Sequence, residues 1–124
     1  MTTNPSTDTD MDTGALDLRT VPLHLGLGSR AVAVPEFGWS SEQLAAYGER
    51  FAADGAEGRL VALFDQSASW DTWERHPAGD EVVILVSGRA DLIQERDGRE
   101  HVTPMAPGEA VINPAGVWHT AEVH

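Results

Sequence analysis

From Gly58 to the end of the chain, polar and apolar residues alternate with a period of two, in short runs separated by turn signals. This alternation is typical of β-strands, because successive side chains of a strand point to opposite faces. The clearest turn is Asp97-Gly98, a dipeptide that favours tight hairpins with positive φ. We expect strands at 60–64, 69–75, 81–86, 90–95, 100–105, 110–113 and 117–123. So many short strands predict an all-β chain that forms a barrel or a double-sheet jelly roll.

The N-terminal half departs from this pattern. Residues 1–15 are rich in Thr and Asp with hardly an apolar residue, and we interpret them as a disordered acidic tail. Residues 16–37 contain short apolar runs broken by Pro and Gly, which indicates two extended segments whose pairing the sequence leaves open.

One short helix is predicted between these segments and the strands. Ser40 followed by Gln43 fits a capping box, and Leu44, Tyr47 and Phe51 then recur at helical spacing before a glycine ends the pattern. We interpret Tyr47 and Phe51 as packing residues on the buried face of this helix.

Composition excludes several functions. The chain has 124 residues, enough for one compact core, and its formal net charge of −12 disfavours nucleic acid, whose binding needs clustered Lys and Arg. All eight basic residues are Arg and cysteine is absent, so lysine chemistry, thiol catalysis and thiolate metal sites are excluded. No segment approaches membrane-spanning length, and we expect a soluble cytoplasmic protein without membrane contact.

Four residues could supply metal ligands. In an extended strand Glu74 and His76 share one face, while Glu81 and His119 each begin an otherwise apolar, inward-facing row. A buried carboxylate needs a partner. If the strands close into a barrel, these four side chains could converge on one cation with two nitrogen and two oxygen donors.

Two motifs resemble those of the cupin family. The segment from His76 to Glu81, followed after six residues by Gly88, is similar to the second half of the first cupin motif, with Glu74 in the place of the usual first histidine. The second motif is matched by Gly108, Pro114, Gly116 and His119, although Val123 stands where the family has Asn. We therefore expect a cupin jelly-roll β-barrel over residues 16–124, with motif 1 at about 74–88 and motif 2 at about 108–119.

The resemblance implies that His76, Glu81 and His119 bind a divalent metal, with Glu74 in the remaining ligand position. This donor set suits Mn, Fe, Co, Ni or Zn. The alternative is a cupin without metal, in which Glu74 forms a plain salt bridge with an arginine such as Arg75. His24 and His101 lie outside both motifs, and we expect no direct role for them.

The inward positions next to these residues predict a pocket for a small-molecule ligand or substrate. We assign its lining to Trp70, Thr72, Val83, Leu85 and Ala121. Trp73 and Trp118 fall on the opposite faces of their strands, which makes them candidates for a helix contact or a homodimer interface.

Two functions remain open at this point. The first is a metal-dependent enzyme of the oxygenase, isomerase or lyase type acting on a small organic substrate. The second is a non-catalytic cupin that binds or senses a small molecule, with or without metal, and fold alone cannot choose between them.

Cupin barrels usually continue for further strands after the second motif, whereas this sequence ends five residues after His119. We expect either that the last strands are missing from this sequence or that residues 16–37 or a second subunit replace them. We predict a homodimer because an open sheet edge invites pairing.

Overall fold

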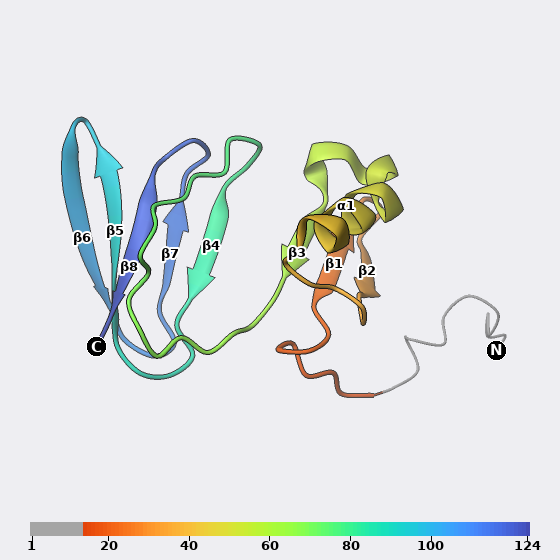
Figure 1. Ribbon diagram of the computed structural model, residues 1–124, viewed down its shortest axis with the longest axis horizontal. Helices are drawn as coiled ribbons and strands as arrows, with labels where there is room; N and C mark the ends of the chain where they lie inside the picture. Colours follow the sequence, from red (N-terminus) through yellow and green to blue (C-terminus); the bar gives the residue numbers. More distant parts are fainter. Residues whose placement is uncertain (1–13) are drawn as a thin grey trace, which may run out of the picture. The chain divides into compact units, whose positions relative to one another are not determined.

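The computed structural model describes residues 14–124, so almost all of the predicted acidic tail lies outside the described residues. The chain divides into two compact units between Phe64 and Asp65 (Figure 1). Whether the first unit belongs to a single cupin domain over residues 16–124 stays a prediction. No helix among residues 14–124 is both long and apolar enough to cross a membrane.

The first unit contains a three-stranded antiparallel sheet in the order β2-β1-β3. Strand β1 (Leu23–Gly26) pairs with β2 (Arg30–Ala33) on one side and with β3 (Arg59–Val61) on the other. The extended segments predicted within residues 16–37 therefore pair with each other and with β3. Whether they also supply strands to the second unit stays a prediction.

The predicted helix is α1 (Ser41–Arg50), and its N-cap is the predicted one. The Ser40 hydroxyl oxygen accepts a hydrogen bond from the Gln43 backbone N–H at 3.1 Å and donates to Gln43 Oε1 at 3.0 Å. A second short helix, the 3₁₀ segment η2 (Ala52–Glu57), was not predicted. Gly55, at φ 58°, interrupts this 3₁₀ segment, and it is the glycine at which the helical spacing of the sequence ends.

A buried histidine holds the helices of the first unit to its sheet. The His24 ring is 2 % exposed and stacks on Phe51 with the ring centroids 3.7 Å apart. Its Nε2 donates to Asp54 and its Nδ1 accepts from the Tyr47 hydroxyl, both at 2.6 Å. Burial, followed by the charge of Asp54, raises the pKa of Tyr47, so this hydroxyl stays a donor. Tyr47 and Phe51 are thus packing residues, as predicted, around a polar centre.

The second unit consists of two antiparallel sheets (Figure 1). One pairs β4 (Glu81–Ile84) with β7 (Ala110–Asn113), and the other has the order β6-β5-β8, with β5 at Ala90–Arg96, β6 at Arg99–Met105 and β8 at His119–Val123. The β5–β6 hairpin turns at Asp97 and Gly98, both with positive φ, as predicted.

The two sheets of the second unit share one core. Leu92, Met105 and Ala121 are buried at its centre, and the half-buried residues Trp70, Val83, Leu85 and Val111 pack against them. No ladder of backbone hydrogen bonds joins the two sheets within residues 65–124, so they form a double sheet and the closed barrel of the prediction is not observed. Residues 14–124 are mostly β, as predicted, with two short helices in place of one.

The run predicted as a strand at 69–75 is irregular. The Trp70 N–H donates to the Ala121 carbonyl at 2.9 Å, and Glu74 exchanges backbone hydrogen bonds with His119 at 2.9 and 2.8 Å. The chain therefore advances four residues from Trp70 to Glu74, while β8 advances only two from His119 to Ala121. The Thr120 hydroxyl donates to the Thr72 carbonyl at 2.8 Å inside the bulge. The excess length replaces a regular strand with a single bridge at Glu74.

Candidate metal centre

Backbone pairing brings the two ends of the candidate site together. Glu74 lies opposite His119, the first residue of β8, and Glu81 is the first residue of β4. The loops beside them are linked, because the Gly116 N–H donates to the His76 carbonyl at 3.1 Å and the Ala115 N–H donates to Asp80 Oδ1 at 2.8 Å. Residues separated by 35 to 45 positions thus meet at one end of the second unit.

His119 presents a buried nitrogen without a hydrogen-bond partner. Its side chain is 1 % exposed, and Nδ1 lies 3.3 Å from the Val117 carbonyl, which can only accept. The ring proton therefore sits on Nδ1, and the lone pair of Nε2 points into the site. Glu81 Oε1 is 3.2 Å from Nε2, but the two atoms are not aligned for a hydrogen bond. A lone pair beside a carboxylate oxygen requires a cation or a proton between them.

Glu81 is held in place by two buried amides. The Asn113 Nδ2 group donates to Glu81 Oε1 at 2.9 Å, and Gln94 Nε2 donates to Asn113 Oδ1 at 2.6 Å and to the Ile112 carbonyl at 2.9 Å. Asn113 lies opposite Glu81 across β4–β7, and Gln94 lies opposite His119 across β5–β8. These four polar residues therefore form a connected row across both sheets.

The outer part of the site is formed by Glu74 and His76, whose side chains are about half exposed. His76 Nε2 lies 3.2 Å from Glu81 Oε2 and 3.8 Å from Glu74 Oε1. One ligand atom from each of Glu74, His76 and His119 lies within 4.8 Å of the other two. Atoms bound to one ion at 2.0–2.2 Å are separated by up to about 4 Å. Small rotations of the exposed Glu74 and His76 side chains would bring them within this range.

The family model for the cupin domain matches residues 61–124, slightly more than half of the chain. This chain belongs to the cupin family. The family has a jelly-roll fold, which agrees with the double sheet of residues 65–124. No curated protein and no solved structure matches the chain.

The cupin domain places most of the predicted pocket residues in its core. Ala121 is buried, and Trp70, Val83 and Leu85 pack against the same cluster. The Trp70 ring lies near His119, with the centroids 6.3 Å apart, whereas Thr72 is exposed. Their role in lining a pocket stays a prediction. Trp118 packs under Arg75, whose guanidinium carbon is 5.0 Å from the ring centroid, and both Trp73 and Trp118 remain partly exposed.

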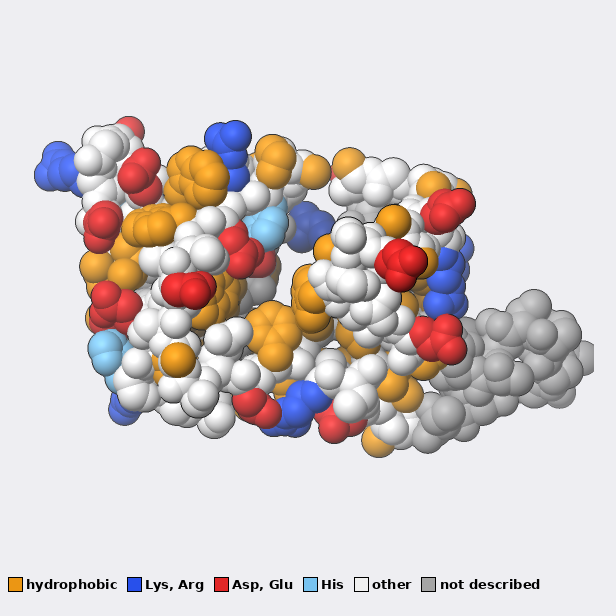
Figure 2. Space-filling model, in the orientation of Figure 1, with side chains coloured by type: hydrophobic (Ala, Val, Ile, Leu, Met, Phe, Trp, Pro, Cys, Tyr) orange, Lys and Arg blue, Asp and Glu red, His pale blue; other side chains and the backbone are white. Residues whose placement is uncertain are grey.

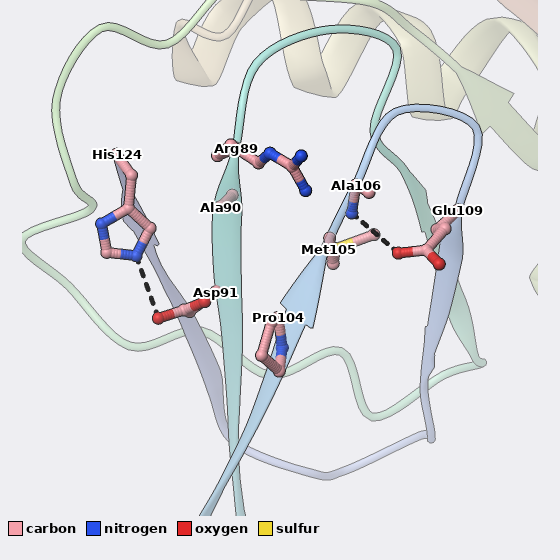
Figure 3. Close-up of a pocket in the computed structure, with 8 residues that line it drawn as sticks. All are labelled: Arg89, Ala90, Asp91, Pro104, Met105, Ala106, Glu109 and His124. Carbon is pink, nitrogen blue, oxygen red and sulfur yellow. Dashed lines mark hydrogen bonds and ion pairs between the residues drawn. The ribbon is translucent and has the colours of Figure 1, made fainter.

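A separate pocket of about 390 Å³ lies at the other end of β5, where Ala90 and Asp91 meet His124 (Figure 3). None of the predicted site residues lines it. His124 Nε2 and Asp91 Oδ2 are hydrogen-bonded at 2.9 Å, and with Glu122 they form an exposed acidic cluster. Since His124 and Asp91 satisfy each other at the surface, the buried and unpartnered His119 nitrogen marks the stronger site.

Sequence reasoning did not identify Asn113 and Gln94. Each is a polar residue on the inward face of a strand. Asn113 shares that face with Val111, and Gln94 shares it with Leu92, two positions earlier in each case. The same signal had selected Glu81 and His119. Applied to every strand of the cupin domain, it would have found all four residues of the buried row.

Proposed function

We propose that this cupin binds one divalent metal ion through His76, Glu81 and His119, with Glu74 as either a fourth ligand or a general base, and that the ion serves catalysis on a small organic substrate. The observation that carries the proposal is the buried Nε2 of His119, which has a free lone pair and no hydrogen-bond partner. Such a group is costly inside a protein unless it meets a cation.

The donor set supports a borderline transition metal. Two imidazole nitrogens and two carboxylate oxygens suit Mn, Fe, Co, Ni or Zn, and the two carboxylates balance a divalent charge. Without a cation these carboxylates would face each other across His76, which lies between Glu74 and Glu81. When bound, the ion would supply Lewis-acid or redox chemistry to a substrate oxygen atom.

The chain's own residues would orient the ligands. The Val117 carbonyl fixes the tautomer of His119, and Asn113 holds one oxygen of Glu81 while Gln94 holds Asn113. Contacts of this kind fix ligand orientation in metal sites. The apolar cluster around Leu92 and Ala121 closes the inner side of the site to water.

A second candidate function is binding without turnover. Apart from the four proposed ligands, the residues predicted to line the site offer only Thr72 as a polar side chain, and Thr72 is exposed. If Glu74 serves as a ligand, these residues supply no general base. This favours a cupin that binds or senses a small molecule, and the role of Glu74 decides between the two functions.

Elemental analysis of protein purified without chelator tests the metal. We expect close to one equivalent of a first-row transition metal per chain, and calorimetric titration of the stripped protein should identify which of the five ions binds. His119→Gln should abolish this binding, whereas His101→Gln, which changes an exposed histidine outside both motifs, should not. Less than a small fraction of one metal, with no thermal shift on adding any of the five ions, would contradict the proposal.

Glu74→Ala then separates the two functions. Loss of metal would make Glu74 a ligand and favour binding without turnover. Full metal occupancy would leave Glu74 free to act as a base, and substrate screens should then use Glu74→Ala as the inactive control.

A further inference from the structure

Three aromatic side chains of the first unit line one pocket of about 170 Å³. Phe37 and Trp39 come from the segment before α1, and Phe64 follows β3. Trp39 is 61 % exposed and Phe64 is 51 % exposed, so both rings present apolar surface to solvent. Large exposed aromatics that gather around a hollow mark a ligand site more often than isolated ones do.

The Trp39 ring contacts both Phe37 and Phe64 at nearly right angles. The planes of Phe37 and Trp39 meet at 89° with their centroids 4.9 Å apart, and those of Trp39 and Phe64 meet at 80° with centroids 6.1 Å apart. Phe37 is fixed from behind by an edge contact with Tyr47, which is itself hydrogen-bonded to the buried His24. The pocket is therefore lined in part by an aromatic cluster on an ordered support.

The overall charge of the chain favours a cationic ligand. The faces of aromatic rings carry partial negative charge and attract organic cations. The chain as a whole has a formal net charge of −12, and acidic side chains are spread over the face seen in Figure 2. Arg19 also lines the pocket, but its Nη1 lies 3.7 Å from Asp17 Oδ1, so that pair adds little net charge.

We propose that the pocket formed by Phe37, Trp39 and Phe64 binds a small quaternary ammonium compound. The ring faces of such an aromatic cluster suit a trimethylammonium group, which is bulky, permanently charged and weakly hydrated. The volume of 170 Å³ lies well below the roughly 300–1,000 Å³ of pockets for drug-sized ligands, which limits the ligand to a headgroup of this size. This site is independent of the proposed metal centre, because all its lining residues precede Asp65.

Titration with choline, followed by calorimetry and tryptophan fluorescence in the presence of EDTA, tests the proposal on the full chain. The comparison ligand is 3,3-dimethyl-1-butanol, which has the same shape as choline without the charge. We expect choline to bind saturably and the neutral analogue to bind at least about fivefold more weakly. Because EDTA removes divalent metal, the outcome does not depend on whether the metal centre exists.

Variants locate the site. Trp39→Ala should abolish choline binding and Trp39→Phe should retain part of it, while Trp118→Ala, which removes a similarly exposed tryptophan from the second unit, should leave it unchanged. Circular dichroism on each variant checks folding. Equal affinity for choline and the neutral analogue would overturn the proposal, as would undiminished binding by Trp39→Ala. Binding of acetate at this pocket in place of choline would also overturn it, since Arg19 would then be the recognition element.

Discussion

Asn113 and His119 are the most deeply buried side chains of the polar row at the cupin site, each with 1 % of its surface exposed. Both polar atoms of the Asn113 amide are hydrogen-bonded, because Nδ2 donates to Glu81 and Oδ1 accepts from Gln94. This arrangement leaves Glu81 Oε2 directed at His76, 3.2 Å away. Asn113 therefore sets the position of a proposed ligand without contacting the ion itself.

Replacing this amide should weaken metal binding without removing a ligand. Asn113→Leu keeps a similar volume but leaves Glu81 and Gln94 without their partner, and we expect the metal dissociation constant to rise about 10- to 100-fold. Calorimetric titration of the stripped protein measures it. Ile112→Ala, one residue earlier on β7 with a side chain 60 % exposed, is the matched control and should bind normally. An unchanged metal dissociation constant in Asn113→Leu would contradict this expectation, because the position of Glu81 would then not depend on Asn113.

Asp54 should make the stability of the first unit depend on pH. The hydrogen bond from His24, supported by the Leu27 N–H and by Arg30, holds the pKa of Asp54 below its ordinary value of 3.8 despite the opposing effect of burial. A carboxylate with a lowered folded-state pKa stabilises the fold fully above its unfolded pKa, and this contribution is lost as the pH falls through the folded value. We expect thermal melting to show a loss of stability in acid that Asp54→Asn largely lacks. Asp17→Asn, at an exposed carboxylate, serves as control. Parallel pH curves for Asp54→Asn and the wild type would contradict this expectation.

Two of the residues that the sequence singled out were selected for the same physical reason. Glu81 and His119 stood out because a polar residue in an apolar row is rare, and the structure places both at the same end of the double sheet. His24 was assigned no direct role because it lies outside the motifs, yet it is the buried centre of the first unit. Its partners Tyr47 and Asp54 are 23 and 30 positions away, a distance at which local pattern gives no information.

Helix α1 depends on its cap more than on burial, because none of its residues is buried. Short helices of this kind are marginal by themselves, so the Ser40 hydrogen bonds contribute a sizeable share of local stability. The capping box was readable from the sequence because both partners are three residues apart.

Removal of this cap should destabilise the first unit. Ser40→Ala is expected to lower the free energy of unfolding by about 1 kcal/mol, measured by urea denaturation. Ser41→Ala makes the same change one residue later, inside the helix, where Ala is a better helix former than Ser, and should be neutral or slightly stabilising. Equal destabilisation by both variants would mean that serine at this end acts through something other than capping.

The strands show where pattern reading stops. A period of two located β4 to β8 within a few residues, because each has one face on the core and one in solvent. The run at 69–75 has the same alternation, but four residues of this run lie opposite only two residues of β8. Whether such a run forms a regular ladder depends on the partner strand, and the partner is distant in sequence. The prediction of a closed barrel failed for the same reason, because closure depends on strands that are distant in sequence.

At the scale of the whole chain, the second unit has a sheet of only two strands. Both β4 and β7 lack a further neighbour among the described residues, and residues 16–37, which we expected as one source of extra strands, form a sheet with β3. The outer face of β4–β7 is strongly apolar, with Val82, Ile84 and Ile112 each more than half exposed. Contiguous exposed apolar surface of this kind is typical of an interaction site.

We therefore propose that two copies of the chain associate through the β4–β7 sheet, which keeps the predicted homodimer and gives it a location. Light scattering coupled to size exclusion at micromolar concentration should give the mass of a dimer. Ile84→Lys puts a charge at the centre of the apolar face and should give a monomer, because an unpaired charge is costly to bury in an interface. Val102→Lys introduces the same charge on β6, at a side chain that is 54 % exposed, and should remain dimeric. A monomeric wild type would refute the dimer, and a dimeric Ile84→Lys would place its interface on another surface.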